Sequence, residues 1–193
     1  MKEQKFWNWF SENQNLYFDF EQNQAELFDR LHKKLNEVNE NITFEFSPKS
    51  GSGKREFVLS ADGIKSSFPS VTKLVESAPS FDNWIIVAFR QPHLECNQIH
   101  YKDIRLYAED TYFRYAKDNR KIGIELNIRN YQDNDDWGVA IFLLLDTILG
   151  EYDTEMMLSW IEMKKLDENE IEKLYPVKEL PSIISEHKKE QWN

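Results

Sequence analysis

"TYFRYAKDNRKIGIELNIR", residues 111–129, shows the alternation of apolar and polar side chains that is typical of two antiparallel strands. Tyr112 and Arg114 alternate with apolar residues in the first half, and aliphatic residues occupy the even positions of 122–128 in the second half. The Asp-Asn pair between the two halves is typical of a turn. The stretch therefore predicts a β-hairpin with one apolar face and one polar face.

The alternation extends upstream, so we expect residues 99–129 to form an antiparallel meander. Polar side chains on one face of this meander are candidates for a binding surface, because guanidinium groups bind carboxylates or phosphates through two hydrogen bonds and tyrosines add flat amphipathic area. These candidates are Arg105, Tyr107, Tyr112, Arg114, Glu125, Asn127 and Arg129, and Arg90 at the end of an apolar strand could join them. The alternative is a solvated face on which charges pair across the strands.

Helical spacing and turn residues define the remaining expected elements. The expected helices cover residues 21–39, about 69–78, 137–149 and 180–189, and the expected strands cover 42–47, 55–60, 84–89 and 157–164. We interpret the apolar run 84–89 as a buried central strand and the apolar helix 137–149 as central and well covered, capped by Asp135 or Asp136 and by Gly150. The predicted class is α+β, with a mostly antiparallel sheet of five to seven strands and helices packed on its apolar face.

The aromatic segment at residues 5–10, KFWNWF, is predicted to start an amphipathic helix. A helical wheel places Phe6, Trp9 and Phe10 on the buried stripe. Trp7 lies about 100° from Phe6 on the same wheel, on the shoulder of the stripe. Trp7 is therefore the aromatic residue that we expect to be available to a partner.

Size and composition indicate one globular domain. The chain has 193 residues, of which 40% are hydrophobic and 14% aromatic, which is enough apolar surface to exclude a disordered chain. A chain of this length fits a single domain, so we expect residues 1–193 to share one core.

The charge is strongly acidic, with 34 Asp and Glu against 24 Lys and Arg, giving a net charge of −10. Nucleic acid is not expected as a partner, because affinity for it rests on basic residues that neutralise phosphates. The same acidity would instead steer the chain towards a protein with a basic surface.

The chain is expected to be cytoplasmic. Cys96 is the only cysteine, so no internal disulfide can form. The first residues lack the apolar run of a signal peptide, and the longest apolar run, 139–145, is far shorter than the ~20 residues that span a bilayer. No membrane association is expected.

The segment "HLECNQIH", residues 93–100, carries the only constellation that suggests metal or nucleophile chemistry. His93, Glu95, Cys96 and His100 are all potential zinc ligands by residue type, although their spacing matches no zinc signature. A related hypothesis is that Cys96 acts as a nucleophile and that His93 or His100 acts as its base. A solvated surface loop is the alternative interpretation, and no cofactor is expected.

Other motifs give no catalytic residue. The loop "SPKSGSGKRE" departs from a phosphate-binding loop, because it lacks the required first glycine and precedes a strand instead of a helix. Carboxylates at the two ends of the apolar helix do not fit a calcium-binding loop and are explained by helix capping and solvation. An enzyme is therefore less favoured than a binding protein.

Four segments together resemble a family: the Phe-Trp-Asn-Trp-Phe start, "FPSVTKLVESAPSFDNWIIVAFR", "LLLDTILGEYDTEM" and "LYPVKELP". The chain resembles a widespread bacterial family of small cytosolic proteins classed as a domain of unknown function. The resemblance spans nearly the whole chain, implies one intact domain and carries no catalytic residue.

Two functions therefore compete. The first is a non-enzymatic binding or regulatory module for a partner with a basic surface, for example as an inhibitor of a basic protein. The second is a small metal-dependent or cysteine-dependent enzyme centred on the His93-Cys96-His100 loop.

Overall fold

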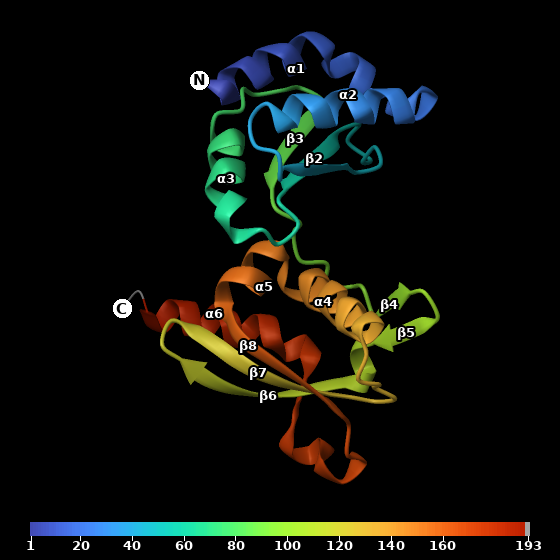
Figure 1. Ribbon diagram of the computed structural model, residues 1–193, viewed down its shortest axis with the longest axis vertical. Helices are drawn as coiled ribbons and strands as arrows, with labels where there is room; N and C mark the ends of the chain where they lie inside the picture. Colours follow the sequence, from blue (N-terminus) through green and yellow to red (C-terminus); the bar gives the residue numbers. More distant parts are fainter. Residues whose placement is uncertain (192–193) are drawn as a thin grey trace. The chain divides into compact units, whose positions relative to one another are not determined.

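The computed structural model describes residues 1–191 and divides the chain into two compact units, Met1–Arg90 and Gln91–Asn193 (Figure 1). Each unit contains helices and strands, so the α+β class is confirmed. Chain length led us to expect one core, whereas each unit buries apolar side chains of its own. That the whole chain acts as a single domain stays a prediction.

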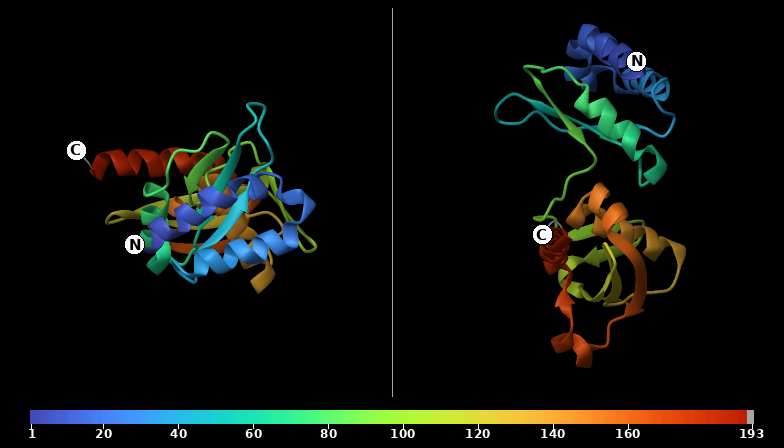
Figure 2. Two further views of the ribbon diagram at one scale, coloured as in Figure 1. Left: turned by 90° about the horizontal axis from the view of Figure 1, so that it is seen from above. Right: turned by 90° about the vertical axis from the view of Figure 1, so that its left-hand side faces the viewer.

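Unit 1 is a three-stranded sheet with helices on one side, in the strand order β1-β2-β3. In Figure 2 its strands lie to one side of α1 and α2. β1 and β2 form the predicted hairpin, whereas β2 and β3 run parallel and are joined through α3. The elements are α1 (Lys2–Phe18), η1 (Phe20–Gln22), α2 (Gln24–Asn36), β1 (Thr43–Phe46), β2 (Arg55–Ser60), η2 (Lys65–Ser67), α3 (Phe68–Glu76) and β3 (Trp84–Ala88).

The core of unit 1 corrects the predicted phase of the first helix. Trp7 is fully buried, and its Nε1 donates a hydrogen bond to the carbonyl oxygen of Leu74 in α3, at 2.7 Å. Trp9 is only half-buried. The buried stripe of α1 contains residues 3, 6, 7, 10 and 17, so the expectation that Trp7 is available to a partner is wrong.

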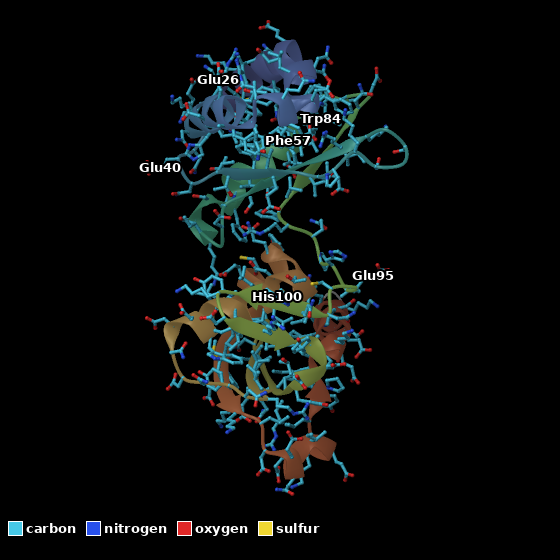
Figure 3. All side chains as sticks on the ribbon, turned by 90° about the vertical axis from the view of Figure 1, so that its right-hand side faces the viewer. Glu26, Glu40, Phe57, Trp84, Glu95 and His100 are labelled. Atoms are coloured by element: carbon cyan, nitrogen blue, oxygen red, sulfur yellow. The ribbon has the colours of Figure 1, made fainter. Side chains whose placement is uncertain are left out.

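The apolar strand 84–89 is confirmed as β3, but its predicted central place is wrong because β3 lies at the edge of its sheet. Trp84 faces the helices, where its ring lies 5.6 Å from that of Phe10 and 6.1 Å from that of Phe57. Figure 3 shows Phe57 and Trp84 beneath the helices of unit 1. The apolar run therefore reflects burial against helices on one face instead of burial on both faces.

Unit 2 contains a hairpin, a four-stranded sheet and two longer helices. The hairpin pairs β4 with β5, and the sheet has the order β8-β7-β6-β9, in which β7 and β8 are parallel. The elements are β4 (Gln98–Tyr101), β5 (Ile104–Tyr107), η3 (Ala108–Asp110), β6 (Thr111–Asp118), β7 (Lys121–Ile128), α4 (Asp135–Leu149), α5 (Glu151–Met157), β8 (Leu158–Lys165), η4 (Glu168–Lys173), β9 (Tyr175–Pro176), η5 (Val177–Glu179) and α6 (Leu180–Gln191).

The predicted hairpin at residues 111–129 is confirmed as β6 and β7, and its apolar face is the floor of the unit 2 core. Ile124 and Leu126 of β7 are buried beneath Ile141 and Leu145 of α4. α4 and α6 lie on the same side of this sheet (Figure 1). The other side carries the polar residues of the hairpin.

The predicted sheet size is wrong, because the described strands form sheets of three, two and four strands. The meander divides at η3, which turns the chain between β5 and β6. The edge of β6 that β5 was expected to occupy is taken by β9, with Tyr112 opposite Pro176. Most of the strand pairs are antiparallel, as predicted.

α4 begins at Asp135, one residue earlier than a cap at Asp135 allows and two residues earlier than a cap at Asp136 allows. Asn134 is the N-cap residue, and its side-chain oxygen accepts a hydrogen bond from the backbone N–H of Trp137 at 3.1 Å. Asp135 and Asp136 instead lie in the first turn, where the helix dipole favours negative charge. Gly150 ends the helix with φ 79°, as predicted for a glycine cap.

Candidate functional site

The register of β6 and β7 brings four of the predicted binding residues together on the polar face of the sheet. Tyr112 lies opposite Asn127, and Arg114 lies opposite Glu125. Their side chains share this face because residues two apart along a strand point to the same side. The structure therefore confirms the grouping of these residues, while their use in binding a partner stays a prediction.

The charged groups of this polar face already have partners within unit 2. Arg114 Nη2 lies 2.8 Å from Glu170 Oε2, and Lys164 Nζ lies 2.5 Å from Glu125 Oε2. Arg129 Nε lies 2.8 Å from Glu168 Oε1, and its Nη1 bonds Asp110.

The electrostatics of the polar face follow from these pairs. The Lys164 ammonium, with a further hydrogen bond from Asn127, holds the pKa of Glu125 below its ordinary value. The Arg129 guanidinium lowers the pKa of Glu168 in the same way. The face therefore matches the alternative in which charges pair across strands, with η4 supplying two of the carboxylates.

The remaining predicted binding residues lie elsewhere. Arg105 and Tyr107 belong to the β4–β5 hairpin, which is not part of the β6–β7 sheet. Arg90 lies in unit 1, where it pairs with Asp62 at 2.7 Å and with Glu45 at 3.3 Å. The sequence pattern alone does not reveal this separation, because the alternation of β5 is the same in a separate hairpin as in a continuous meander.

Arg105 lines a small polar depression of about 410 Å³ near the start of α4. Lys102 also lines it, and its Nζ lies 2.6 Å from Asp136 Oδ1. The buried Trp137 closes part of the floor. The lining contains two cationic residues, Lys102 and Arg105, and two anionic residues, Asp103 and Asp136. The depression therefore favours neither an anionic nor a cationic ligand.

The residues of the predicted metal loop do not converge. Among the described residues, no group of three or more His, Cys, Asp or Glu side chains is placed to hold a metal ion. Cys96 Sγ donates to the carbonyl oxygen of Gln98 at 3.3 Å, and His100 lies on β4 opposite Arg105. Figure 3 shows Glu95 and His100 well apart. The structure therefore does not bring these residues together, and metal or cysteine chemistry at this loop stays a prediction.

A feature that sequence reasoning missed lies on the outer face of α4. Val139, Phe142 and Leu143 remain 41%, 43% and 40% exposed, so α4 is not covered on all sides as predicted. They line a shallow hollow of about 640 Å³ that we call the α4 groove. Its lining consists of Tyr131, Asp133, Asn134, Asp135, Gly138, Val139, Phe142, Leu143, Asp146 and Met163.

The α4 groove combines this apolar floor with carboxylates. Asp133, Asp135 and Asp146 line it, and the lining includes no lysine or arginine. Tyr131 Oη donates to Asp133 Oδ1 at 3.3 Å, and its pKa is raised by partial burial and by the neighbouring carboxylate. The groove is therefore both apolar and negatively charged.

One signal in the sequence pointed to this groove. The helix is apolar on nearly all sides, and a helix packed on one face of a sheet can bury only one broad stripe. Residues 135, 139, 142, 143 and 146 recur at helical spacing as a second stripe, apolar in the middle and acidic at both ends. Sequence reasoning assigned Asp135 to helix capping and solvation, and it did not consider Asp146.

Comparison with known proteins yields no family model, no curated protein and no solved structure that matches this chain. The resemblance to a bacterial domain of unknown function therefore stays a prediction. None of the helices within residues 1–191 is both long enough and apolar enough to span a membrane.

Proposed function

We propose that this protein is a non-enzymatic protein-binding module whose α4 groove holds a basic, amphipathic segment of its partner. The observation that supports the proposal is the coincidence of an exposed apolar stripe with carboxylates at both of its ends, on one face of one helix. Grooves of this kind accept an amphipathic helix through its apolar face.

The apolar floor supplies affinity. Complete burial of a Val, Leu or Phe side chain contributes about 1.5–3 kcal/mol. Since about 40% of each floor side chain is exposed in the free protein, covering Val139, Phe142 and Leu143 contributes roughly 0.6–1.2 kcal/mol per residue. This supports a moderate, reversible interaction.

The carboxylates supply selectivity for charge. Asp135 and Asp146 are eleven positions apart on α4, a rise of about 16 Å along the helix axis. A matching partner helix carries lysines or arginines about three turns apart on either side of an apolar stripe. The net charge of −10 adds long-range attraction and accelerates association with such a partner.

The polar face of the β6–β7 hairpin is a weaker candidate for binding a protein partner. A partner carboxylate that approached Arg114 or Arg129 would have to replace Glu170 or Glu168, which these guanidinium groups already bind. The α4 groove, by contrast, offers exposed apolar area, and its lining contains carboxylates but no lysine or arginine.

The test uses synthetic peptides and the full-length protein. The probe is a labelled helical peptide with a leucine stripe flanked by two lysines eleven residues apart, and its binding is followed by fluorescence anisotropy. One control peptide replaces the lysines by glutamates, and a second moves them to the opposite helix face at unchanged composition. Only the first peptide is expected to bind, and more weakly as NaCl rises from about 50 to about 500 mM.

Matched variants assign the binding to the groove. Phe142→Ser with Leu143→Ser is expected to raise the peptide Kd about tenfold, equivalent to ~1.4 kcal/mol. Leu16→Ser with Leu94→Ser, at two exposed leucines outside the groove, is expected to leave the Kd unchanged.

A second variant pair tests the charges. Asp133→Asn, Asp135→Asn and Asp146→Asn together should weaken binding of the lysine peptide. Glu12→Gln, Glu40→Gln and Glu172→Gln together remove as many negative charges from exposed positions outside the groove and should not. Equal Kd values for the two triple variants, or equal binding of the glutamate peptide, would refute the proposed function.

A further inference from the structure

The segment between β8 and β9 leaves the sheet and returns to it. Leu166 at its start and Leu174 at its end are buried, whereas η4 between them has no buried residue. The backbone N–H of Leu166 bonds the carbonyl oxygen of Ile128 at 3.0 Å, and Tyr175 pairs with Phe113, so both ends of the segment are fixed to the sheet. Figure 1 shows η4, in orange-red, on the side of the sheet away from α4 and α6.

The backbone of η4 makes no hydrogen bond to the sheet among the described residues. Its bonds are local, because the N–H of Glu170 bonds the carbonyl oxygen of Asp167 and the N–H of Leu174 bonds that of Ile171. Ile171 is the one apolar side chain in residues 167–173, and it is only half-buried. The middle of the segment therefore has no fully buried apolar anchor.

Ion pairs connect η4 to the polar face of the β6–β7 hairpin. Both carboxylate oxygens of Glu168 accept hydrogen bonds from the Arg129 guanidinium, Oε1 from Nε at 2.8 Å and Oε2 from Nη2 at 2.9 Å. Glu170 Oε2 accepts from Arg114 Nη2 at 2.8 Å. Two carboxylates on one short turn thus bind one guanidinium on β6 and one at the end of β7.

Contacts of this kind are weak and depend on salt. The side chains of Arg114, Arg129 and Glu168 are 48%, 37% and 59% exposed, so water and dissolved ions reach the pairs. Salt screens such charges, since the Debye length falls from about 10 Å at 0.1 M to about 3 Å at 1 M. A segment attached in this way opens more easily than the sheet, whose other face is a buried apolar core.

We propose that η4 is a strap that closes over Arg114 and Arg129 through these ion pairs and opens while the rest of unit 2 stays folded. The carboxylates of Glu168 and Glu170 occupy the places that an oxyanion from outside the chain would take on these guanidinium groups. The closed strap is therefore an autoinhibitory contact. It concerns the polar face alone and is independent of the α4 groove.

Opening of the strap affects the two arginines unequally. Arg129 also bonds Asp110, which lies in η3 and outside the strap. For Arg114, Glu170 is the only carboxylate within ion-pair distance among the described residues. Opening therefore uncovers Arg114 more completely than Arg129.

The experiment measures access to the guanidinium groups directly. The full chain reacts with phenylglyoxal, an arginine-specific reagent, and peptide mass spectrometry gives the modification rate at each arginine. An increase in NaCl from about 50 to about 500 mM is expected to raise the rate at Arg114 at least about threefold, and the rate at Arg129 by less. Arg120, in the turn between β6 and β7, has no ion pair among residues 1–191 and should react at an unchanged rate. A rate at Arg114 that does not respond to salt would contradict the strap.

Two matched variants assign the effect to η4. Glu168→Gln with Glu170→Gln keeps the size of both side chains and removes the charges that close the strap. At about 50 mM NaCl this variant should show the fast modification of Arg114 that wild type shows only at about 500 mM. Glu172→Gln with Glu179→Gln removes as many charges from exposed positions that have no ion pair among residues 1–191, and should react like wild type. Equal rates at Arg114 in the two double variants would rule out the strap.

Amide hydrogen exchange separates opening of the strap from unfolding of the unit. In the Glu168→Gln, Glu170→Gln variant the amides of Glu170 and Leu174, which are bonded within the strap, should lose protection. The amides of Ile124 and Leu126 in β7 should keep theirs. Loss of protection in β7 together with η4 would overturn the inference, because η4 would then not open by itself.

Discussion

Trp7 and Trp9 lie two positions apart in α1, yet only Trp7 belongs to the core. The Trp7 ring lies 4.9 Å from that of Phe6 in an edge contact, and its indole N–H is bonded inside the unit. Trp9 is instead covered by charged side chains, with the guanidinium of Arg30 5.5 Å and the ammonium of Lys34 5.9 Å from its ring. Such cation–π contacts leave a ring partly exposed to solvent.

Trp7→Ala is expected to lower the free energy of unfolding by about 3–5 kcal/mol, the usual loss for a buried large aromatic side chain. Trp9→Ala should cost less than half as much, because the half-buried ring leaves a smaller cavity. Urea or guanidinium melts followed by circular dichroism measure both values. A larger loss for Trp9→Ala would contradict the observed orientation of α1.

Gly123 in β7 is required by the close approach of Trp160 from β8. A Cβ atom at position 123 would lie 1.9 Å from Cε2 of the Trp160 ring, a distance that no pair of carbon atoms tolerates without movement. The indole therefore packs against the strand backbone where a side chain is missing, and Trp160 still remains exposed on its outer side.

Gly123→Ala is expected to destabilise the fold by about 1–3 kcal/mol and to shift the indole fluorescence, because the Trp160 ring must move. Adding Trp160→Ala should remove most of the clash, so the effects of the two substitutions should not add. The control is Gly138→Ala in α4, where a Cβ atom meets nothing within 4 Å and helix propensity improves. Additive losses in the double variant would refute the contact.

At the scale of the elements, ion pairs link β8 and η4 to the β6–β7 hairpin. Glu125 on β7 is linked to Lys164 on β8, and Arg114 on β6 is linked to Glu170 in η4. These pairs are partly exposed, and pairs of this kind contribute about 0.2–1 kcal/mol each. The sheet itself is held mainly by its buried apolar face.

The Glu125–Lys164 pair predicts a dependence of stability on pH. Lys164 lowers the pKa of Glu125 in the folded protein below its ordinary value of 4.5. The stabilisation is therefore complete above about pH 4.5 and is lost as the pH falls through the lower folded pKa. Denaturant melts of wild type and Glu125→Gln should differ by about 0.5–1 kcal/mol at pH 7, and the difference should shrink as the pH falls below the lowered pKa of Glu125.

The control for this pH dependence is Glu172→Gln, which removes an exposed carboxylate that has no ion pair among residues 1–191. At pH 7 its difference from wild type should be smaller than that of Glu125→Gln, because it has no ion pair to lose. A Glu125→Gln difference that grows on acidification would contradict the assigned pair.

On the scale of the whole molecule, the chain divides into two compact units, and each unit buries apolar side chains of its own. The α4 groove is lined only by residues of unit 2, where it combines apolar and acidic side chains. The proposed binding of a basic segment therefore depends on unit 2 alone.

The sequence by itself determined the local elements. Alternation between apolar and polar residues identified the hairpin of β6 and β7, and helical spacing identified α2 and α4, because these periods follow from strand and helix geometry alone. Net charge, which depends only on composition, favoured a basic partner.

Only the tertiary structure decided which residues those elements bury and which they leave exposed. The same apolar run can occur in an edge strand and in a central strand. The sequence therefore predicted a central position for β3, whereas the structure places β3 at the edge of its sheet. Three further predictions were wrong for the same reason. Trp7 lies in the core, Arg105 lies in a separate hairpin, and Phe142 lies in an open groove. Burial is set by packing between segments distant in sequence, and local periodicity carries no information about those contacts.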